Sequence, residues 1–277
     1  EKQATMAQGK SMKKAGSSIR TIRNKNLRIK RSSTLIRRHA ETIFRAALTS
    51  ARADTAVFHC LSREKTERGE RLRCGKWRIP LRLGGRIIVV GAGKAAADMG
   101  RAAEKILGRR IHGGAVVTKY GHGKKCRRLE VIEGGHPVPD AAGLRAAGRI
   151  GDWVDAAGPE DLVLFLLSGG ASALMPAPAE GLTLADKQKV TDAMLRGGAP
   201  IEALNCVRKH LSQLKGGHLA RRAAPARVLV LVVSDVIGDP LDVIGSGPAA
   251  GDFTVFSDAG RQMKRFGVWR SAPKAVR

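Results

Sequence analysis

The sequence predicts an α/β fold of the Rossmann-like, doubly wound type, with a mostly parallel sheet and helices on both faces. Three observations predict it: short apolar runs alternate with helical patterns, the runs are continuously apolar, and each run ends in a Gly-rich or polar cluster. Continuous apolar runs are typical of strands buried on both faces, and their alternation with helices is typical of a parallel sheet. Because ligands of such sheets bind beyond the carboxyl ends of the strands, we expect the site where these clusters lie.

Each element follows from its own pattern of apolar residues. The expected strands are 86–90, 114–118, 129–133, 162–167 and 227–233, and the expected helices are 35–51, 95–107, 141–156, 183–197 and 200–222. The polar, basic stretch 62–86 suggests a hairpin around Trp77. Residues 1–33 show no periodicity, which is typical of disorder.

The positive charge is unevenly distributed. Residues 1–90 carry 23 Lys and Arg against 6 Asp and Glu, a net charge of +17, whereas residues 91–277 have a net charge of +9. The excess therefore lies mostly outside the motif-bearing part, which argues against a nucleic-acid partner. We expect a basic disordered leader over 1–34, a single Rossmann-like domain over 35–260, and the truncated start of a following segment over 261–277. The leader could be a disordered tail, an organellar transit peptide or a non-native extension.

Several protein classes are excluded by composition. The cysteines Cys60, Cys74, Cys126 and Cys206 show no C-x-x-C spacing, so we expect reduced thiols in a cytoplasmic protein. No apolar run is long enough to cross a bilayer, and the N-terminal residues contain no apolar core of a secretory signal. We therefore expect no membrane partner.

The turn from Gly91 to Lys94 follows the first strand and opens a helix. Glycines let backbone N–H groups approach an anion there, and a helix N-terminus favours negative charge. The spacing also fits the loose G-x-G-x-x-A dinucleotide pattern. A tight turn without a ligand is the alternative. Because the second strand ends in Thr118 and Lys119 rather than an acidic residue, NAD is disfavoured and NADP stays open.

Two further clusters follow later strands. The small residues from Ser168 to Ser172 form a second loop that can expose backbone donors to an anion, or can be a structural turn. Asp235 and Asp239 follow the fifth strand, where a carboxylate suits Mg²⁺ or a general base, or only caps a turn. A small-residue loop at 246–248 lies nearby in the sequence.

The segment 202–215 has two stripes at helical spacing. The apolar stripe should be buried and consists of Leu204, Val207, Leu211 and Leu214. The polar stripe lies one residue later, at a cleft margin or a solvated boundary, and consists of Asn205, Arg208, Ser212 and Lys215. Arg and Lys there could hold a carboxylate or phosphate. His210 is compatible with a surface or packing role.

These blocks, in this order, resemble the class II glycerate 2-kinase family, whose members are sometimes labelled hydroxypyruvate reductases. The resemblance runs from about Leu35 to Ala259. Its longest motifs are VVGAGKAAADM (89–99), GGHPVPDAAGL (134–144), LLSGGASALMPAPAEGLTLADKQ (166–188), NCVRKHLSQLKGGHLA (205–220) and SDVIGDPLDVIGSGP (234–248).

The resemblance implies transfer of the ATP γ-phosphoryl group to D-glycerate, giving 2-phosphoglycerate, with Mg²⁺ as cofactor. It also implies a cleft between this domain and a smaller second domain that is missing from the sequence. An NADPH-dependent hydroxypyruvate reductase, a nucleic-acid-binding protein acting through its leader, and a fragment without activity are the alternatives.

Carried over residue by residue, the resemblance assigns four roles. The implied catalytic residues are Lys94, Arg208 and Asp235. The implied nucleotide-binding residues are Gly91, Gly93, Ser168, Gly169, Gly170, Ser172 and Lys215. The implied substrate-binding residues are His136, Asn205, Lys209, His210, Ser246 and Gly247. The implied metal ligands are Asp235 and Asp239. Two positions depart from the family pattern: Ala171 replaces a glycine and could crowd a phosphate, and Ala249 replaces a threonine and could remove a hydroxyl contact.

Overall fold

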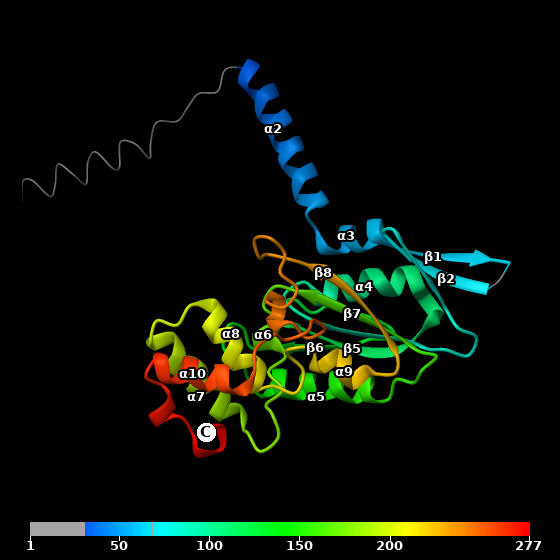
Figure 1. Cartoon of the computed structure of the whole chain (residues 1–277). Coiled ribbons are helices and arrows are strands. Elements are labelled where there is room, and N and C mark those ends of the chain that lie inside the picture. The colour runs from blue at the N-terminus through cyan, green and yellow to red at the C-terminus, as the bar shows by residue number, and fades with distance from the viewer. Residues whose placement is uncertain (1–30, 68) are drawn as a thin grey trace, which may run out of the picture. The chain divides into compact units, whose positions relative to one another are not determined.

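The computed structural model describes residues 31–67 and 69–277 (Figure 1). Contacts within the chain divide it into two units, 1–50 and 51–277. The first unit contains helix α2, Arg31–Ser50, which begins before the expected Leu35. Of the leader predicted over 1–34, residues 1–30 lie outside the described residues. Among the described helices, none is long and apolar enough to cross a bilayer.

A five-stranded sheet of order β6-β5-β4-β7-β8 forms the centre of the second unit, and all its strand pairs are parallel (Figure 1). The chain order reverses between β4 and β7, so the carboxyl edge there is the switch point at which ligands of this fold bind. The strands are β4 (Ile87–Ala92), β5 (Ile111–Lys119), β6 (Glu130–Gly134), β7 (Leu162–Ser168) and β8 (Arg227–Val233).

Helices cover both faces of this sheet, because its strands are apolar on both sides. Ile88 and Val90 of β4 pack into one core cluster, with α5 (Ala141–Asp155) and α9 (His218–Ala223). Ile87 and Val89 pack into the opposite cluster. That cluster includes α3 (Ala53–Cys60) and α4 (Ala96–Leu107). The doubly wound α/β fold predicted from the sequence is confirmed.

A small antiparallel sheet follows α3. Its strands are β1 (Leu61–Thr66), β2 (Gly69–Cys74) and β3 (Trp77–Pro80), in that order. The hairpin expected around Trp77 is present, because Cys74 pairs with Trp77 across the β2–β3 turn, whereas β1 was not expected. The four cysteines are free thiols, as predicted. They are not all scattered, because the sulfurs of Cys60 and Cys74 lie 3.3 Å apart.

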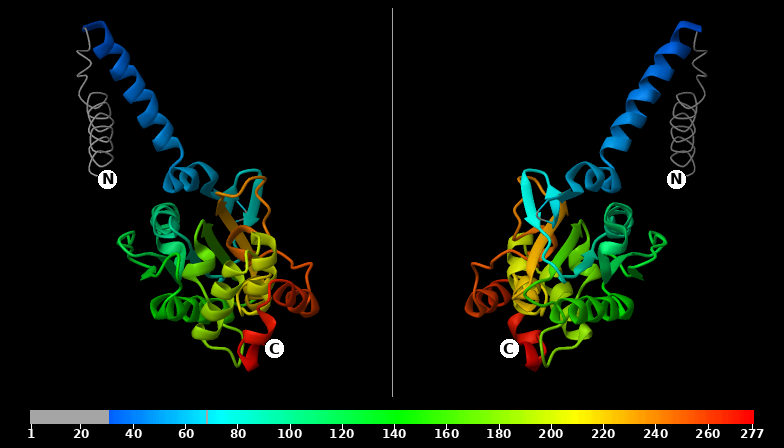
Figure 2. Two further views of the ribbon diagram at one scale, coloured as in Figure 1. Left: turned by 90° about the vertical axis from the view of Figure 1, so that its left-hand side faces the viewer. Right: turned by 90° about the vertical axis from the view of Figure 1, so that its right-hand side faces the viewer.

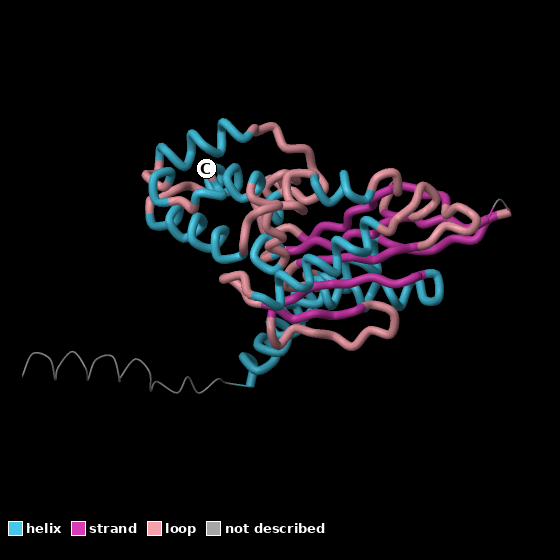
Figure 3. The backbone as a smooth tube through the Cα atoms, turned by 90° about the horizontal axis from the view of Figure 1, so that it is seen from below, coloured by secondary structure: helices cyan, strands magenta, loops and turns pink. Residues whose placement is uncertain are grey.

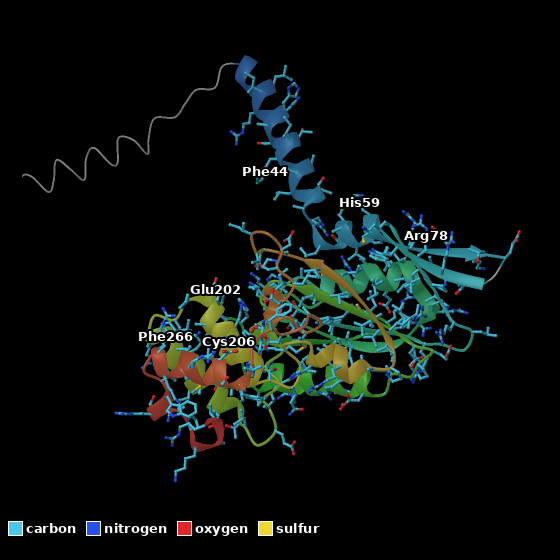
Figure 4. The ribbon with its side chains drawn as sticks, viewed as in Figure 1. Phe44, His59, Arg78, Glu202, Cys206 and Phe266 are labelled. Carbon is cyan, nitrogen blue, oxygen red and sulfur yellow. The ribbon has the colours of Figure 1, made fainter. Side chains whose placement is uncertain are left out.

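A layer of helices extends the domain beyond the carboxyl edge of the sheet (Figures 1 and 3). It consists of α6 (Ala171–Leu174), α7 (Leu184–Arg196), α8 (Ile201–His210) and α10 (Phe256–Arg265). Short 3₁₀ turns lie at 108–110, 244–246, 269–271 and 274–276. Cys206 of α8 and Phe266 after α10 belong to the core of this layer (Figure 4).

The C-terminal residues pack into the same layer. Met263, Val268 and Ala272 are buried against α7 and α8, beside which the chain ends (Figure 2). The structure therefore places 261–277 in the same unit as the sheet.

The helix expected over 200–222 is two helices. α8 ends at His210, and α9 begins at His218 after Gly216 and Gly217, whose φ angles of 59° and 81° lie in the left-handed region. Such angles end a helix, and glycine adopts them without strain. Ser212 and Lys215 consequently lie in the connecting turn and do not continue a helical stripe.

Candidate functional site

Lys94, His136 and Asp235 meet at the carboxyl edge of the sheet, and we call them the edge cluster. The Lys94 ammonium lies 3.8 Å from the Asp235 carboxylate. A methyl group at Gly170 would come within 2.9 Å of the His136 ring, and one at Gly169 would come within 2.2 Å of the Asp235 carboxylate. The fold thus brings polar residues that follow β4, β6 and β8 together at this edge, beside the glycines that follow β7.

The turn after β4 is packed against the loop after β7. Gly93 has a φ of 134°, and a methyl group there would lie 2.2 Å from the Ser168 hydroxyl oxygen. The Lys94 N–H donates to the Gly169 carbonyl at 2.9 Å, and the Ala95 N–H donates to the Ser168 hydroxyl oxygen at 3.0 Å. The Gly93 N–H donates to the carbonyl of Val117. These backbone donors are already engaged, so only the Lys94 side chain of this turn is free to meet a phosphate.

The loop from Ser168 to Ser172 differs from the turn after β4 in the hydrogen bonding of its backbone N–H groups. Backbone N–H groups of Gly170, Ala171 and Ser172 have no hydrogen-bond acceptor in the described part of the chain. The Ala171 side chain is fully buried in the core, so the methyl group that replaces the family's glycine does not project toward a ligand. This loop can therefore present backbone donors to an anion, as predicted.

A chain of hydroxyl groups fixes the loop against α8. The hydroxyls of Ser172 and Ser246 are 3.0 Å apart, and the Ser246 hydroxyl donates to the Asn205 side-chain carbonyl at 3.0 Å. Ser246 has a φ of 64° and is flanked by glycines in the same region. Gly247 must be small, because a methyl group there would lie 2.8 Å from the carbonyl oxygen of Asp242.

A cavity of about 540 Å³ opens beside this loop. Three buried or half-buried cations line it, Lys187, Arg208 and Lys215, together with the exposed Lys189 and the carboxylate of Asp192. We call it the basic cavity. The Lys187 ammonium donates to the Pro176 carbonyl, and the Lys215 ammonium donates to the Met175 carbonyl at 2.8 Å. Among the ion pairs of the described residues, none includes Lys187, Arg208 or Lys215, and Asp192 pairs with Arg196 at 2.8 Å.

Burial destabilises the charged forms of these cations. Lys187 is 7% exposed and Lys215 is 1% exposed. Burial, and then repulsion by Arg208, lowers the pKa of Lys187 to about 7. Burial, followed by the charges of Lys187 and Arg208, lowers the pKa of Lys215 well below its usual range. Burial also lowers the pKa of Arg208.

The pKa of the His136 imidazole is lowered in the folded chain. Burial lowers its pKa, and the neighbouring charges of Lys94 and Lys119 lower it further. The neutral ring is therefore favoured around pH 7, and a neutral ring can accept a hydrogen bond from a hydroxyl group.

Lys209 and His210 lie on the side of α8 that contacts residues 242–256. The Lys209 ammonium pairs with Asp242 at 3.3 Å and with Asp252 at 3.4 Å. The His210 Nδ1 atom lies 2.9 Å from the carbonyl oxygen of Cys206, and its ring packs edge-on against Phe256. The structure thus gives both residues partners within the fold and brings neither of them into the edge cluster or the basic cavity.

Residues 39–277 match the family described as a domain of unknown function, DUF4147. The chain belongs to this family. A D-glycerate 2-kinase of Thermotoga maritima is 50% identical to this DUF4147 chain over 184 residues, which are 66% of this chain and 44% of that protein. An Agrobacterium vitis protein with the provisional name hydroxypyruvate reductase is 46% identical over 190 residues, 69% of this chain and 43% of the other.

The crystal structure of a glycerate kinase from Thermotoga maritima has the same fold as this DUF4147 chain. The TM-score is 0.75 at 41% identity, over 88% of this chain and 54% of that one. The resemblance to the glycerate 2-kinase family is therefore confirmed. This chain spans about half the length of the relatives that it matches.

The two acidic residues predicted as metal ligands, Asp235 and Asp239, follow β8 in one exposed loop. Asp235 is 61% exposed beside Lys94, and Asp239 is exposed in the same loop with a φ of 50°. The described residues contain no group of three or more side chains that could hold a metal by themselves. Mg²⁺ commonly uses one or two carboxylates together with phosphates and water, so Asp235 and Asp239 stay the candidate carboxylates for such an ion.

Sequence reasoning missed Lys187. It lies in the buried stripe of α7 with Val190 and Met194, within the motif 166–188. A lysine in a buried stripe is rare unless it is paired, and this was the available signal.

Proposed function

We propose that this chain carries the phosphoryl-transfer site of an ATP-dependent glycerate 2-kinase, which converts D-glycerate to 2-phosphoglycerate. The observation that carries the proposal is the edge cluster, in which an ammonium, an imidazole and a carboxylate surround a glycine loop. A cavity lined by four further cations lies beside this loop. Phosphoryl transfer is catalysed mainly by positioning and by charge stabilisation, which such an arrangement supplies. The glycerate kinase names of relatives support the same reaction.

Lys94 and Asp235 are assigned to the transferred phosphoryl group. The Lys94 ammonium, 44% exposed, would stabilise the charge that develops on its oxygens. Asp235, with Asp239 as the second candidate, would hold Mg²⁺, which neutralises phosphate charge when it is bound. The free N–H groups of the loop from Gly170 to Ser172 add donors on the same side.

His136 is assigned to the glycerate hydroxyl group. Its ring contacts the same glycine as the Lys94 side chain, so a hydroxyl bound to it would lie beside the phosphoryl group. The depressed pKa keeps the ring able to accept that hydrogen bond at neutral pH. Asn205 and Ser246 position the loop, and Arg208 contributes charge from the cavity side.

We assign the reaction to a kinase rather than a reductase because of the first glycine turn. A dinucleotide needs the N–H groups of that turn for its pyrophosphate. Here the Lys94 and Ala95 N–H groups bind Gly169 and Ser168, which argues against an NADPH site. We also propose, from the family resemblance, that a second domain completes the cleft over the edge cluster.

The test is product analysis with the second domain present. The protein is incubated with MgATP and D-glycerate, and enolase, which consumes 2-phosphoglycerate but not 3-phosphoglycerate, reports the product. We expect enolase-dependent product. NADPH oxidation with hydroxypyruvate, in place of any phosphoglycerate, would overturn the proposal.

A further inference from the structure

We propose that Cys60 and Cys74 form an oxidation site, at which a small disulfide such as glutathione disulfide converts the two thiols into a reversible intramolecular disulfide bond. Cys60 is the last residue of α3, directly before the first strand of the small antiparallel sheet, and Cys74 is the last residue of β2. The site uses none of the groups assigned to phosphoryl transfer, so it is independent of the proposed kinase reaction.

The first argument is the geometry of the junction between α3 and the small sheet. Leu61 pairs with Cys74 across β1 and β2, and the Gly75 N–H donates to the Cys60 carbonyl at 2.9 Å. These contacts hold the two cysteine backbones as neighbours, and the two sulfur atoms lie 3.3 Å apart. A disulfide bond has an S–S distance of about 2.05 Å, so the sulfurs have to approach by only roughly 1 Å.

The second argument is the different exposure of the two thiols. Cys60 is half-buried, whereas Cys74 is 6% exposed. A cavity of about 400 Å³ borders both residues, and Lys76 also lines it. Cys60 is therefore the thiol that a disulfide from solution reaches first, beside a lysine that favours an anionic one such as glutathione disulfide.

Cys74 is suited to the second step of the reaction. Burial, and then the hydrogen bond with Cys60, raises the pKa of the Cys74 thiol to about 12. Cys74 therefore stays protonated while Cys60 reacts, and its S–H can donate to the Cys60 sulfur. Such a hydrogen bond stabilises a thiolate on Cys60, and the thiolate is the form of cysteine that attacks a disulfide.

The reaction consists of two thiol–disulfide exchanges. In the first, the Cys60 thiolate attacks one sulfur of glutathione disulfide, and one glutathione leaves as a thiolate, which takes up the proton that Cys60 had released to water. In the second, the Cys74 sulfur attacks the Cys60 sulfur, and the other glutathione leaves with the Cys74 proton. The two protein thiols are thereby oxidised to one disulfide, and glutathione disulfide is reduced to two glutathione molecules.

The other thiols of the chain lie in other parts of the domain. Cys126 is half-buried in the loop before β6, and Cys206 is buried in α8. The described residues contain no group of three or more side chains that could hold a metal, so Cys60 and Cys74 do not belong to such a group. Cys126, with an exposure similar to that of Cys60, is an internal control for unspecific oxidation.

The experiment is incubation of the full chain with mixtures of reduced and oxidised glutathione, followed by alkylation of the remaining thiols and peptide mapping by mass spectrometry. We expect a cross-link between Cys60 and Cys74, no glutathione retained on either residue, and reversal by dithiothreitol. The oxidised chain should also melt at a higher temperature than the reduced chain. The cross-link joins residues 14 positions apart and restricts the unfolded state.

Single substitutions test the order of the two steps. Cys74→Ser should stop at a mixed disulfide between Cys60 and glutathione, whereas Cys60→Ser should leave Cys74 reduced under the same conditions. Cys126→Ser is the matched control, because it replaces another half-buried thiol, and it should form the cross-link as the wild type does. The mapping of the wild-type chain does not depend on whether any of these variants folds.

Three results would overturn the proposal. The first is that Cys60 and Cys74 both stay open to alkylation at glutathione ratios that modify Cys126. The second is a glutathione adduct that persists on Cys60 of the wild-type chain, which would make it a single reactive thiol. The third is a disulfide from either residue to Cys126 or Cys206, because the 3.3 Å contact would then not determine which bond forms.

Discussion

At the scale of single residues, Lys187 illustrates what a sequence pattern can and cannot reveal. The helical spacing of Lys187, Val190 and Met194 identifies one buried face of α7. The spacing does not show what surrounds the lysine, because the Pro176 carbonyl that accepts its hydrogen bond and the neighbouring Arg208 and Lys215 come from other segments. Lys94, His136 and Asp235 were predictable, since parallel strands bring their ends to one edge.

The depressed pKa of Lys187 predicts that stability depends on pH. The unfolded chain keeps the lysine proton up to its ordinary pKa of 10.5, whereas the folded chain releases it above about pH 7. The unfolded state therefore binds more protons between these values, and stability should rise with pH across this window. The resulting gain in the free energy of unfolding from Lys187 is on the order of a few kcal/mol. Denaturant unfolding at pH 7 and pH 9 measures it, and Lys187→Met should show a smaller rise.

Lys94→Ala and Asp235→Asn should each reduce turnover by a factor of about 10² or more, because they remove charge stabilisation of the transferred phosphoryl group. The fold should persist, since both side chains are largely exposed. The measurement is the enolase-coupled rate with the second domain present, together with melting temperature. Asp239→Asn is the comparison for the metal role. Near-normal turnover in either variant would remove that residue from the mechanism.

At the scale of elements, a Gly-x-Gly turn has the same sequence whether its N–H groups meet a phosphate or another loop. Here the N–H groups donate to Ser168 and Gly169 of another loop, and no local sequence pattern reveals these hydrogen bonds. The break between α8 and α9 was easier to predict, because the adjacent Gly216 and Gly217 interrupt an otherwise helical pattern.

The packing of these two loops predicts a large effect of Gly93→Ala. A methyl group there would lie 2.2 Å from the Ser168 hydroxyl and 2.4 Å from the Ser168 carbonyl oxygen, at a φ of 134°. Steric overlap and backbone strain together should cost about 2 kcal/mol or more in free energy of unfolding. Denaturant unfolding measures it.

Gly148→Ala is the matched control, because its methyl group would enter open space on helix α5. Alanine is the better helix former, so this variant should gain roughly 0.5–1 kcal/mol. Equal stability of the Gly93→Ala variant and the wild type would show that the two loops can separate.

At the scale of the whole molecule, the five-stranded sheet was predictable because its strands are short apolar runs with clear ends. The C-terminal extent of this unit was harder to predict from the sequence. Met263 and Val268 lie in a basic segment without a clear apolar run, and only the three-dimensional packing against α7 and α8 gives them a core. The small sheet of β1 to β3 was harder to predict for another reason, because half of the residues in β1 and in β2 are charged and form no continuous apolar run.

The exposure of the edge cluster leads to the last prediction. Lys94 is 44% exposed and Asp235 is 61% exposed, so in residues 1–277 water reaches the groups that would stabilise the transition state. Phosphoryl transfer depends on alignment and on excluding water, and electrostatic stabilisation weakens in a wet site. Lys187 and Lys215 of the basic cavity, in contrast, are 7% and 1% exposed.

Residues 1–277 alone should therefore bind MgATP in calorimetry, yet release ADP with D-glycerate far below the roughly 1–100 s⁻¹ that is typical of kinases. A coupled ADP-release assay measures this, and the same chain joined to a second domain is the positive control. Binding without turnover is the expected result, because Lys215, which the family resemblance assigns to the nucleotide, is buried, while Lys94 and Asp235 are exposed. Glycerate-dependent ADP release at an ordinary kinase rate would show that this chain shields its own edge cluster, and the assignment of that shielding to a second domain would then be wrong.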